Sequence, residues 1–134
     1  MPTERLTILV ADDSPDNLAI LVHALSPTYR VRVAISGERA LEMCRSDDRP
    51  ALVLLDVTLQ GMDGYTVCAR LKADSATAHI PVIFVTGDTS RSNEDRCVAV
   101  GGADCVTKPV GLSLLLRRVQ TQVELIDLRA RLRR

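Results

Sequence analysis

Several apolar runs of this chain end on polar side chains that could act together in chemistry. A pair of aspartates follows the first run, a third aspartate closes a later run, and a threonine and a lysine end two more. If these runs are parallel strands of one sheet, the side chains that follow them emerge along the same edge. The residues concerned are Asp12, Asp13, Asp56, Thr86 and Lys108.

Three carboxylates gathered at one edge need positive charge beside them. At a separation of about 5 Å and an effective dielectric constant of about 20, each pair repels by roughly 3 kcal/mol. Lys108 can offset one of these charges, and Mg²⁺ suits the remaining oxygen ligands. The Asp56 carboxylate could then attack a phosphoryl group and form an acyl phosphate. Lys108, the cation and the hydroxyl of Thr86 would meet the added negative charge.

The elements that position these residues follow from an alternation of short apolar runs and amphipathic stretches. This alternation is typical of βα units and a parallel sheet. We therefore expect an α/β fold: a doubly wound, flavodoxin-like sheet of five parallel strands in the order 2-1-3-4-5, with five helices. The predicted strands cover residues 6–11, 29–34, 51–55, 81–85 and a short stretch around 106. The predicted helices cover 15–25, a segment that starts after Ser36, 65–73, 90–100 and 112–132.

Composition indicates one folded domain. The chain has 134 residues, 46% of them hydrophobic, which suffices for a core without metal or disulfide support. The net charge of zero argues against nucleic acid or a membrane as the main partner. We expect a cytoplasmic location, since no stretch reaches the roughly 18 apolar residues of a membrane span and no signal-peptide pattern is present. The cysteines form no CxxC pair and are predicted to be buried free thiols: Cys44, Cys68, Cys97 and Cys105.

Taken together, the motifs resemble the receiver domain of bacterial two-component response regulators. The resemblance rests on Asp12-Asp13, the segment 56–64, Thr86-Gly87 and Lys108-Pro109, in this order and at the spacing of that family. It covers roughly residues 6–120. We therefore assign residues 1–120 to a receiver domain, and residues 121–134 to an extension of its last helix, which could start a coiled coil or lead to an output module.

The resemblance implies a role for each site residue. Asp56 would accept a phosphoryl group from a histidine kinase or phosphotransfer protein, and the domain would be a signalling switch that catalyses only its own phosphorylation and dephosphorylation. Thr86 would be the switch hydroxyl and Lys108 the phosphate-binding lysine, followed by a cis peptide bond to Pro109. Mg²⁺ would be held by Asp12, Asp13, Asp56 and the backbone carbonyl of Thr58.

Two positions bear on the response to phosphorylation. The family places Tyr or Phe three residues before the lysine, where this chain has Cys105. We interpret Cys105 as a small buried thiol, so the switch would rely on backbone movement around Thr86 and the fourth helix. Asp88, with Thr58, resembles the residues that flank the path of the attacking water, so we expect Asp88 to influence the lifetime of the acyl phosphate.

The last helix is predicted to carry two apolar stripes. Early members of the first stripe should pack on the sheet, whereas the second should seek a partner helix, in a homodimer or in an output module. A solvated helix end is the alternative. The first stripe contains Leu112, Leu116, Val119, Val123, Ile126 and Ala130, and the second contains Leu125, Leu128 and Leu132.

Other functions remain open at this point. The pair Asp12-Asp13, Asp56, Thr86 and Lys108 could each be a strand terminator, a turn residue or a solvated charge, but four such coincidences are less economical than one shared site. The chain could also be a receiver module of a larger regulator or hybrid kinase. A phosphohydrolase that works through an aspartyl phosphate is disfavoured because Thr58 stands where that pattern needs an acid. A flavodoxin-like ligand-binding module would need a glycine-rich loop after the first strand, and residues 13–16 do not provide it.

Overall fold

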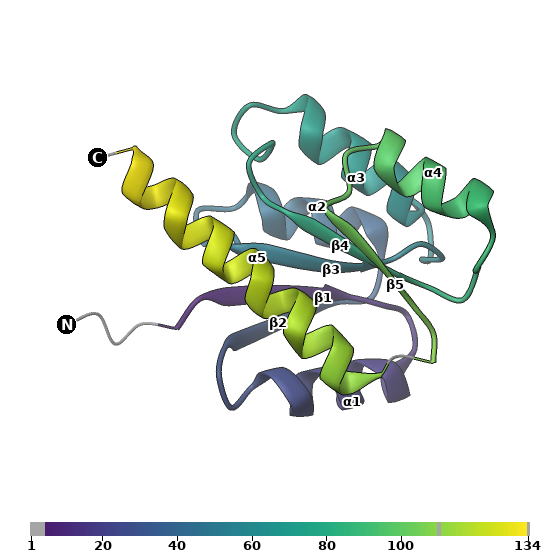
Figure 1. Cartoon of the computed structure of the whole chain (residues 1–134). Helices are drawn as coiled ribbons and strands as arrows, with labels where there is room; N and C mark the ends of the chain where they lie inside the picture. The colour runs from purple at the N-terminus through teal and green to yellow at the C-terminus, as the bar shows by residue number, and fades with distance from the viewer. Residues whose placement is uncertain (1–4, 110, 134) are drawn as a thin grey trace.

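The computed structural model describes residues 5–109 and 111–133, in which strands and helices alternate (Figure 1). The strands are β1 (Thr7–Ala11), β2 (Arg30–Ala34), β3 (Leu52–Asp56), β4 (Val82–Thr86) and β5 (Asp104–Thr107). The helices are α1 (Pro15–Leu25), α2 (Gly37–Arg45), α3 (Gly64–Ala73), α4 (Arg91–Ala99) and α5 (Leu112–Leu132).

All five strands are parallel and lie in the order β2-β1-β3-β4-β5, as predicted. Side chains alternate between the two faces of the sheet. On β1, Ile8 and Val10 join a core with α1 and α5, whereas Leu9 joins a core with α2, α3 and α4. The central strands β1, β3 and β4 are buried along their whole length, as continuous apolar runs predict. β2 lies at one edge of the sheet, and its Val33 is 44% exposed.

Short polar residues set the helix starts. Ser14 precedes α1 and its hydroxyl accepts a hydrogen bond from the backbone N–H of Asn17, with Pro15 at the first helical position. Ser36 caps α2 in the same way. The starts of both helices, at residue 15 and after Ser36, agree with the prediction, and each follows a strand closely. The loop between β1 and α1 is therefore short, and its acidic residues stay at the edge of the sheet.

The sheet-facing side of α5 differs from the prediction. Leu112 and Leu116 were expected to pack on the sheet, but they are 39% and 37% exposed. Val119, from the same predicted stripe, is fully buried as expected, with Val123 packed against it from a partly buried position. Leu115, which lies outside the predicted stripe, is also fully buried. On a helix with 3.6 residues per turn, Leu112 and Leu116 lie roughly 40° and 80° to one side of the line midway between Leu115 and Val119. They flank the buried side and do not form it.

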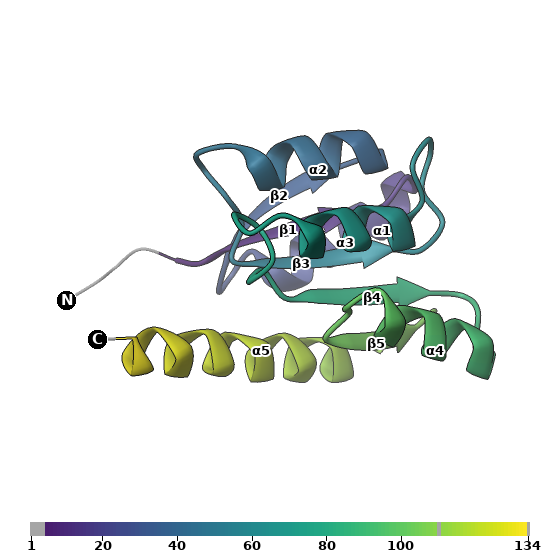
Figure 2. The same cartoon turned by 90° about the horizontal axis from the view of Figure 1, so that it is seen from above.

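The outer side of α5 is apolar and exposed in its last turns. Leu125, Leu128 and Leu132 are 36%, 50% and 76% exposed. Figure 2 shows α5 as one continuous helix alongside the sheet. It runs from the carboxyl ends of the strands back towards the end of the molecule where β1 begins (Figures 1 and 2).

The four cysteines are free thiols, as predicted, but their burial is uneven. Cys44, Cys68 and Cys97 are buried, whereas Cys105 is only partly buried. The expectation of full burial at Cys105 was therefore wrong. Cys105 lies on β5, the edge strand next to β4, where one side of the strand is open to solvent. In the described part of the chain, no helix is long and apolar enough to cross a membrane.

Candidate functional site

Asp56 is the last residue of β3 and is 5% exposed. One oxygen, Oδ2, accepts a hydrogen bond from the Lys108 ammonium at 2.8 Å. The other, Oδ1, accepts from the backbone N–H of Thr58 at 3.0 Å. Burial raises the pKa of Asp56 above its ordinary value, although the bonds from Lys108 and Thr58 act in the opposite direction. The carboxylate is thus held in one orientation at the end of a rigid central strand.

Asp12 follows β1 and is 2% exposed. Its Oδ1 accepts from the backbone N–H of Ser14 at 2.9 Å, and its Oδ2 lies 3.4 Å from the amide nitrogen of Asn17. The helix start after β1 therefore supplies donors to this carboxylate. Sequence reasoning did not single out Asn17, although its place in the first turn of α1, five residues after Asp12, is a usable signal.

Lys108 is the cation of the site. Its Nζ lies 2.8 Å from Asp56 Oδ2 and 3.4 Å from Asp12 Oδ2, so it bridges the two buried carboxylates. Burial alone would lower the pKa of Lys108, but the hydrogen bond and charge of Asp56 raise it overall, and the side chain stays charged. Its backbone N–H donates to the carbonyl of Thr86 at 2.7 Å. The peptide bond from Lys108 to Pro109 is cis.

The remaining predicted site residues lie in the loops around this centre. Thr86, the last residue of β4, is buried, and its Oγ1 accepts from the backbone N–H of Asp88 at 3.0 Å. Because accepting leaves the hydroxyl proton free, Thr86 can still donate to a ligand. Asp88 is exposed and its carboxylate accepts from the N–H of Ser90, which lowers the pKa of Asp88. Thr58 also has an exposed side chain.

Three of these residues form an acidic cluster. One carboxylate oxygen each from Asp12, Asp13 and Asp56 lies within 4.8 Å of the other two, and Asp13 is the exposed member. Hard oxygen ligands with an open, solvent-facing side match the preference of Mg²⁺, which keeps several of its waters. Lys108 supplies one positive charge to the three carboxylates. The donor set and the uncompensated negative charge therefore fit a divalent cation.

A small apolar cavity of about 180 Å³ opens beside the cluster. It lies between α1 and the segment that follows β5. Asp12 and Lys108 form its polar part, and Ile20, which is 52% exposed, contributes to its wall. An apolar surface therefore adjoins the carboxylates on the side of α1.

The loop after Asp56 passes very close to the site. A Cβ on Gly64 would lie 2.3 Å from the carbonyl oxygen of Asp56, so only glycine fits there. Its N–H donates to the carbonyl of Val57 at 2.8 Å. Gly61, earlier in the same loop, has a φ of 73°, which favours glycine. These two glycines fold the chain back so that α3 starts directly against the end of β3.

A polar network beneath α4 was not found from the sequence. The hydroxyl of Tyr65 on α3 donates to Oδ1 of Asn93 on α4. The amide nitrogen of Asn93 donates to the carbonyl of Asp88 at 3.0 Å, and the guanidinium of Arg96 lies 4.1 Å from the centre of the Tyr65 ring. Asn93 thus ties α4 both to α3 and to the loop after Thr86. The available signal is its spacing of four residues from Cys97, which places a polar residue on the inner side of α4.

Comparison with known protein families matches residues 8–120 to the response regulator receiver domain. The chain belongs to this family. Its sheet order and its acidic cluster agree with this assignment.

Individual relatives agree with this assignment. A Vibrio cholerae protein described as a probable cyclic di-GMP phosphodiesterase is 42% identical over 120 residues, which are 90% of this chain and 27% of that protein. The response regulator PleD of Caulobacter vibrioides is 40% identical over 115 residues, 85% of this chain and 25% of that protein. This receiver domain therefore spans about a quarter of the length of these relatives.

Solved structures give the same result. The receiver domain of a DNA-binding response regulator from Colwellia psychrerythraea superposes with a TM-score of 0.82 at 32% identity. The match covers 89% of this chain and 98% of that one. The whole of a solved receiver domain therefore finds its counterpart here.

The raised pKa of Asp56 predicts a cost to the folded receiver domain that depends on pH. The folded state favours the protonated form of the Asp56 carboxyl. The stability that this carboxyl contributes is therefore fully present below the pKa it has in the unfolded chain, and it is lost as the pH rises through the pKa it has in the folded chain. Asp56→Asn removes this group. With divalent cations chelated, we expect the variant to be more stable than the parent chain at neutral pH, and the difference to vanish at about pH 3.

Urea denaturation of both chains across this pH range measures the difference. Asp47→Asn is the matched control, because Asp47 is exposed and the same substitution there should leave the pH profile unchanged. An Asp56→Asn chain less stable than the parent at every pH would contradict the argument.

Proposed function

We propose that this receiver domain is a phosphoacceptor switch in which Asp56 takes a phosphoryl group from a histidine kinase or a phosphotransfer protein. The observation that carries the proposal is the environment of the Asp56 carboxylate. It is nearly buried, fixed by Lys108 and Thr58, and within 4.8 Å of the other two acids. A carboxylate in this setting is oriented for attack and lies where an acyl phosphate would meet positive charge.

Each residue of the site would have its own role in phosphoryl transfer. Asp56 would attack the phosphorus atom, and the bond from phosphorus to the donor nitrogen would break, so that the donor histidine leaves with the electron pair. Lys108, already 2.8 Å from Asp56 Oδ2, would donate to a phosphoryl oxygen. Thr86 would donate a hydrogen bond from its hydroxyl to a second phosphoryl oxygen. The apolar cavity beside α1 lies next to the carboxylates, and we infer that the donor protein approaches there.

Mg²⁺ would be held by Asp12, Asp13, Asp56 and the backbone carbonyl of Thr58. When bound, it supplies positive charge that offsets the carboxylates and the incoming phosphoryl oxygens. Asp12 is already oriented by the N–H of Ser14 and by Asn17, so its binding atom needs little reorganisation.

The response would pass to the face formed by α4, β5 and α5. A hydrogen bond from Thr86 to the phosphoryl group would disturb the bond that Thr86 now accepts from Asp88. Asp88 is joined in turn to Asn93 of α4 through its carbonyl. The family has an aromatic side chain at the position of Cys105. We infer that the route through Asp88 and Asn93 does the work of that side chain here, and that it changes the surface offered to partners.

Phosphorylation of the purified chain tests the proposal. Incubated with Mg²⁺ and acetyl phosphate, the parent chain should gain the mass of one phosphoryl group, measured by intact-mass spectrometry. Asp56→Asn should gain none, because the nucleophilic oxygen is lost, whereas Asp47→Asn should behave like the parent. Chelation of the cation should abolish the gain. An unchanged mass for the parent with this donor and with phosphoramidate would overturn the proposal.

Asp88 is proposed to influence the lifetime of the acyl phosphate. It is exposed two residues after Thr86, and by resemblance to the family it would flank the path of the attacking water. We expect Asp88→Ala to change the rate of phosphoryl loss several-fold, because it removes a charge and the bond to Ser90 that shapes this loop. The decay of the phosphorylated mass with time measures the rate. Asp95→Ala, on the exposed side of α4, is the control, and equal lifetimes in all three chains would exclude the role.

The outer side of α5 is proposed to pack on α5 of a second copy. Leu125, Leu128 and Leu132 are exposed at spacings of three and four residues, which is the pattern of a coiled-coil seam. Sedimentation velocity should show a dimer that forms with rising concentration and is lost when Leu125 and Leu128 are both changed to serine. Leu114→Ser, on the first half of the same helix, should retain it. A monomer at all concentrations, phosphorylated or not, would rule out the second copy and favour an output module as the partner.

A further inference from the structure

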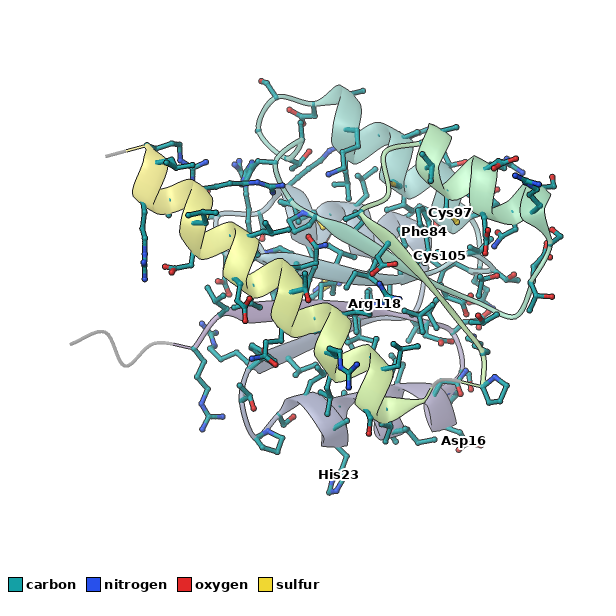
Figure 3. The ribbon with its side chains drawn as sticks, viewed as in Figure 1. Asp16, His23, Phe84, Cys97, Cys105 and Arg118 are labelled. Atoms are coloured by element: carbon teal, nitrogen blue, oxygen red, sulfur yellow. The ribbon has the colours of Figure 1, made fainter. Side chains whose placement is uncertain are left out.

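Two cysteines from different elements face each other outside the phosphoacceptor site. Cys97 lies on α4 and Cys105 on β5, and their sulfur atoms are 3.8 Å apart. Figure 3 shows both side chains close to Phe84, in the layer between α4 and the sheet. Cys105 is the register partner of Phe84 on β4. The pair is therefore held by a helix and a strand that pack together.

The pair is accessible from one side. A surface hollow of about 270 Å³ is lined by both cysteines, with Glu94 and Val98 from α4 and Asp104 from β5. Cys97 is 2% exposed, whereas Cys105 is only partly buried. Of the two cysteines, Cys105 is therefore the more accessible to a small molecule that enters the hollow.

The other two thiols have different surroundings. Cys68 is buried on α3, and its sulfur donates to the carbonyl of Val100 at 3.4 Å. Cys44 is fully buried on α2, within the core beneath that helix. Oxidation that starts at an accessible thiol and ends on a neighbouring one would therefore select Cys97 and Cys105.

We propose that Cys97 and Cys105 form a reversible disulfide when the chain meets a peroxide. The peroxide transfers one oxygen to the Cys105 thiol, which becomes a sulfenic acid while water, or the alcohol of an organic peroxide, leaves. The sulfur of Cys97 then attacks the sulfur of Cys105, its proton joins the departing hydroxyl, and a second water leaves. With hydrogen peroxide, two thiols and one peroxide give one disulfide and two waters. A dithiol reductant reverses the step.

The geometry allows this bond with a small movement. The sulfur atoms must approach from 3.8 Å to about 2.05 Å, which is within reach of side-chain rotation and a slight shift of α4. Burial raises the pKa of Cys97 to about 12 and also raises the pKa of Cys105, with the carboxylate of Glu94 acting in the same direction on both. Both thiols are protonated at neutral pH, so oxidation needs peroxide in excess.

The disulfide would restrain α4. It would close the loop between positions 97 and 105, which contains Gly101 at a φ of 97° and Gly102 packed against the Phe84 ring. The bond would join α4 to β5 covalently across this turn. With it, the backbone amides of α4 should exchange with solvent several-fold more slowly.

The sequence makes the test specific. Trypsin cleaves after Arg96 and next after Arg117, because Lys108 precedes a proline, so both cysteines lie in the peptide 97–117. The reduced full chain is treated with hydrogen peroxide, its remaining thiols are alkylated, and it is digested. We expect the peptide 97–117 to carry no alkyl group and to be lighter by two hydrogen atoms than the same peptide with two free thiols. Cleavage before Asp104 should then leave two fragments joined until a reductant separates them.

Substitutions provide the controls. Cys97→Ala and Cys105→Ala should each lose the linked peptide, whereas Cys44→Ala and Cys68→Ala should keep it, with circular dichroism to verify folding. The parent chain alone also decides the matter. A parent in which all four cysteines remain alkylated, in which Cys105 only gains oxygen atoms, or in which two chains are linked would overturn the proposal. The test uses neither Mg²⁺ nor a phosphodonor, so its result is independent of the proposed phosphoacceptor function.

Discussion

The bond from the Lys108 ammonium to the Asp56 carboxylate is the interaction on which the site depends. The carboxylates of Asp12 and Asp56 are both nearly buried, and like charges so close together repel unless a cation lies beside them. Lys108 fills that role, and its backbone bond to the Thr86 carbonyl fixes the end of β5 against the end of β4. The same lysine thus sets both the charge balance of the site and the place of β5 at the edge of the sheet.

The fold and the site centre could be predicted because their signals are local in sequence. Continuous apolar runs identify the central strands, and Ser14 and Ser36 mark helix starts within one residue. A parallel sheet then brings the residues after each strand to one edge, whichever helices lie between them. The positions of Asp12, Asp56 and Lys108 follow from topology alone, because each terminates a strand or directly follows one.

Other features depend on how elements pack, which a single sequence does not reveal. The burial of Leu115 in place of Leu116 is decided by a rotation of α5 around its axis of roughly half a residue, about 50°. The bond from Tyr65 to Asn93 joins residues 28 positions apart on two helices that must first be docked on the sheet. The contact between Cys97 and Cys105 likewise depends on the depth at which α4 sits on β5. Periodicity indicates which apolar residues share one face of an element, but the packing of one element against another decides which atoms are in contact.

The direction of α5 has a consequence for how information leaves the domain. The helix starts beside the carboxyl edge, just after Lys108, and its 21 residues end near the opposite edge, about 30 Å away. Arg129 there lines a hollow with Ala51 and Pro81, at the starts of β3 and β4. A partner bound to the last turns of α5 would thus be too far away to contact a phosphoryl group on Asp56 directly. It would respond to a tilt or rotation of the whole helix. In such a movement α5 would pivot about its buried residues Leu115 and Val119, and a shift at its first turn would be passed on to its last turns.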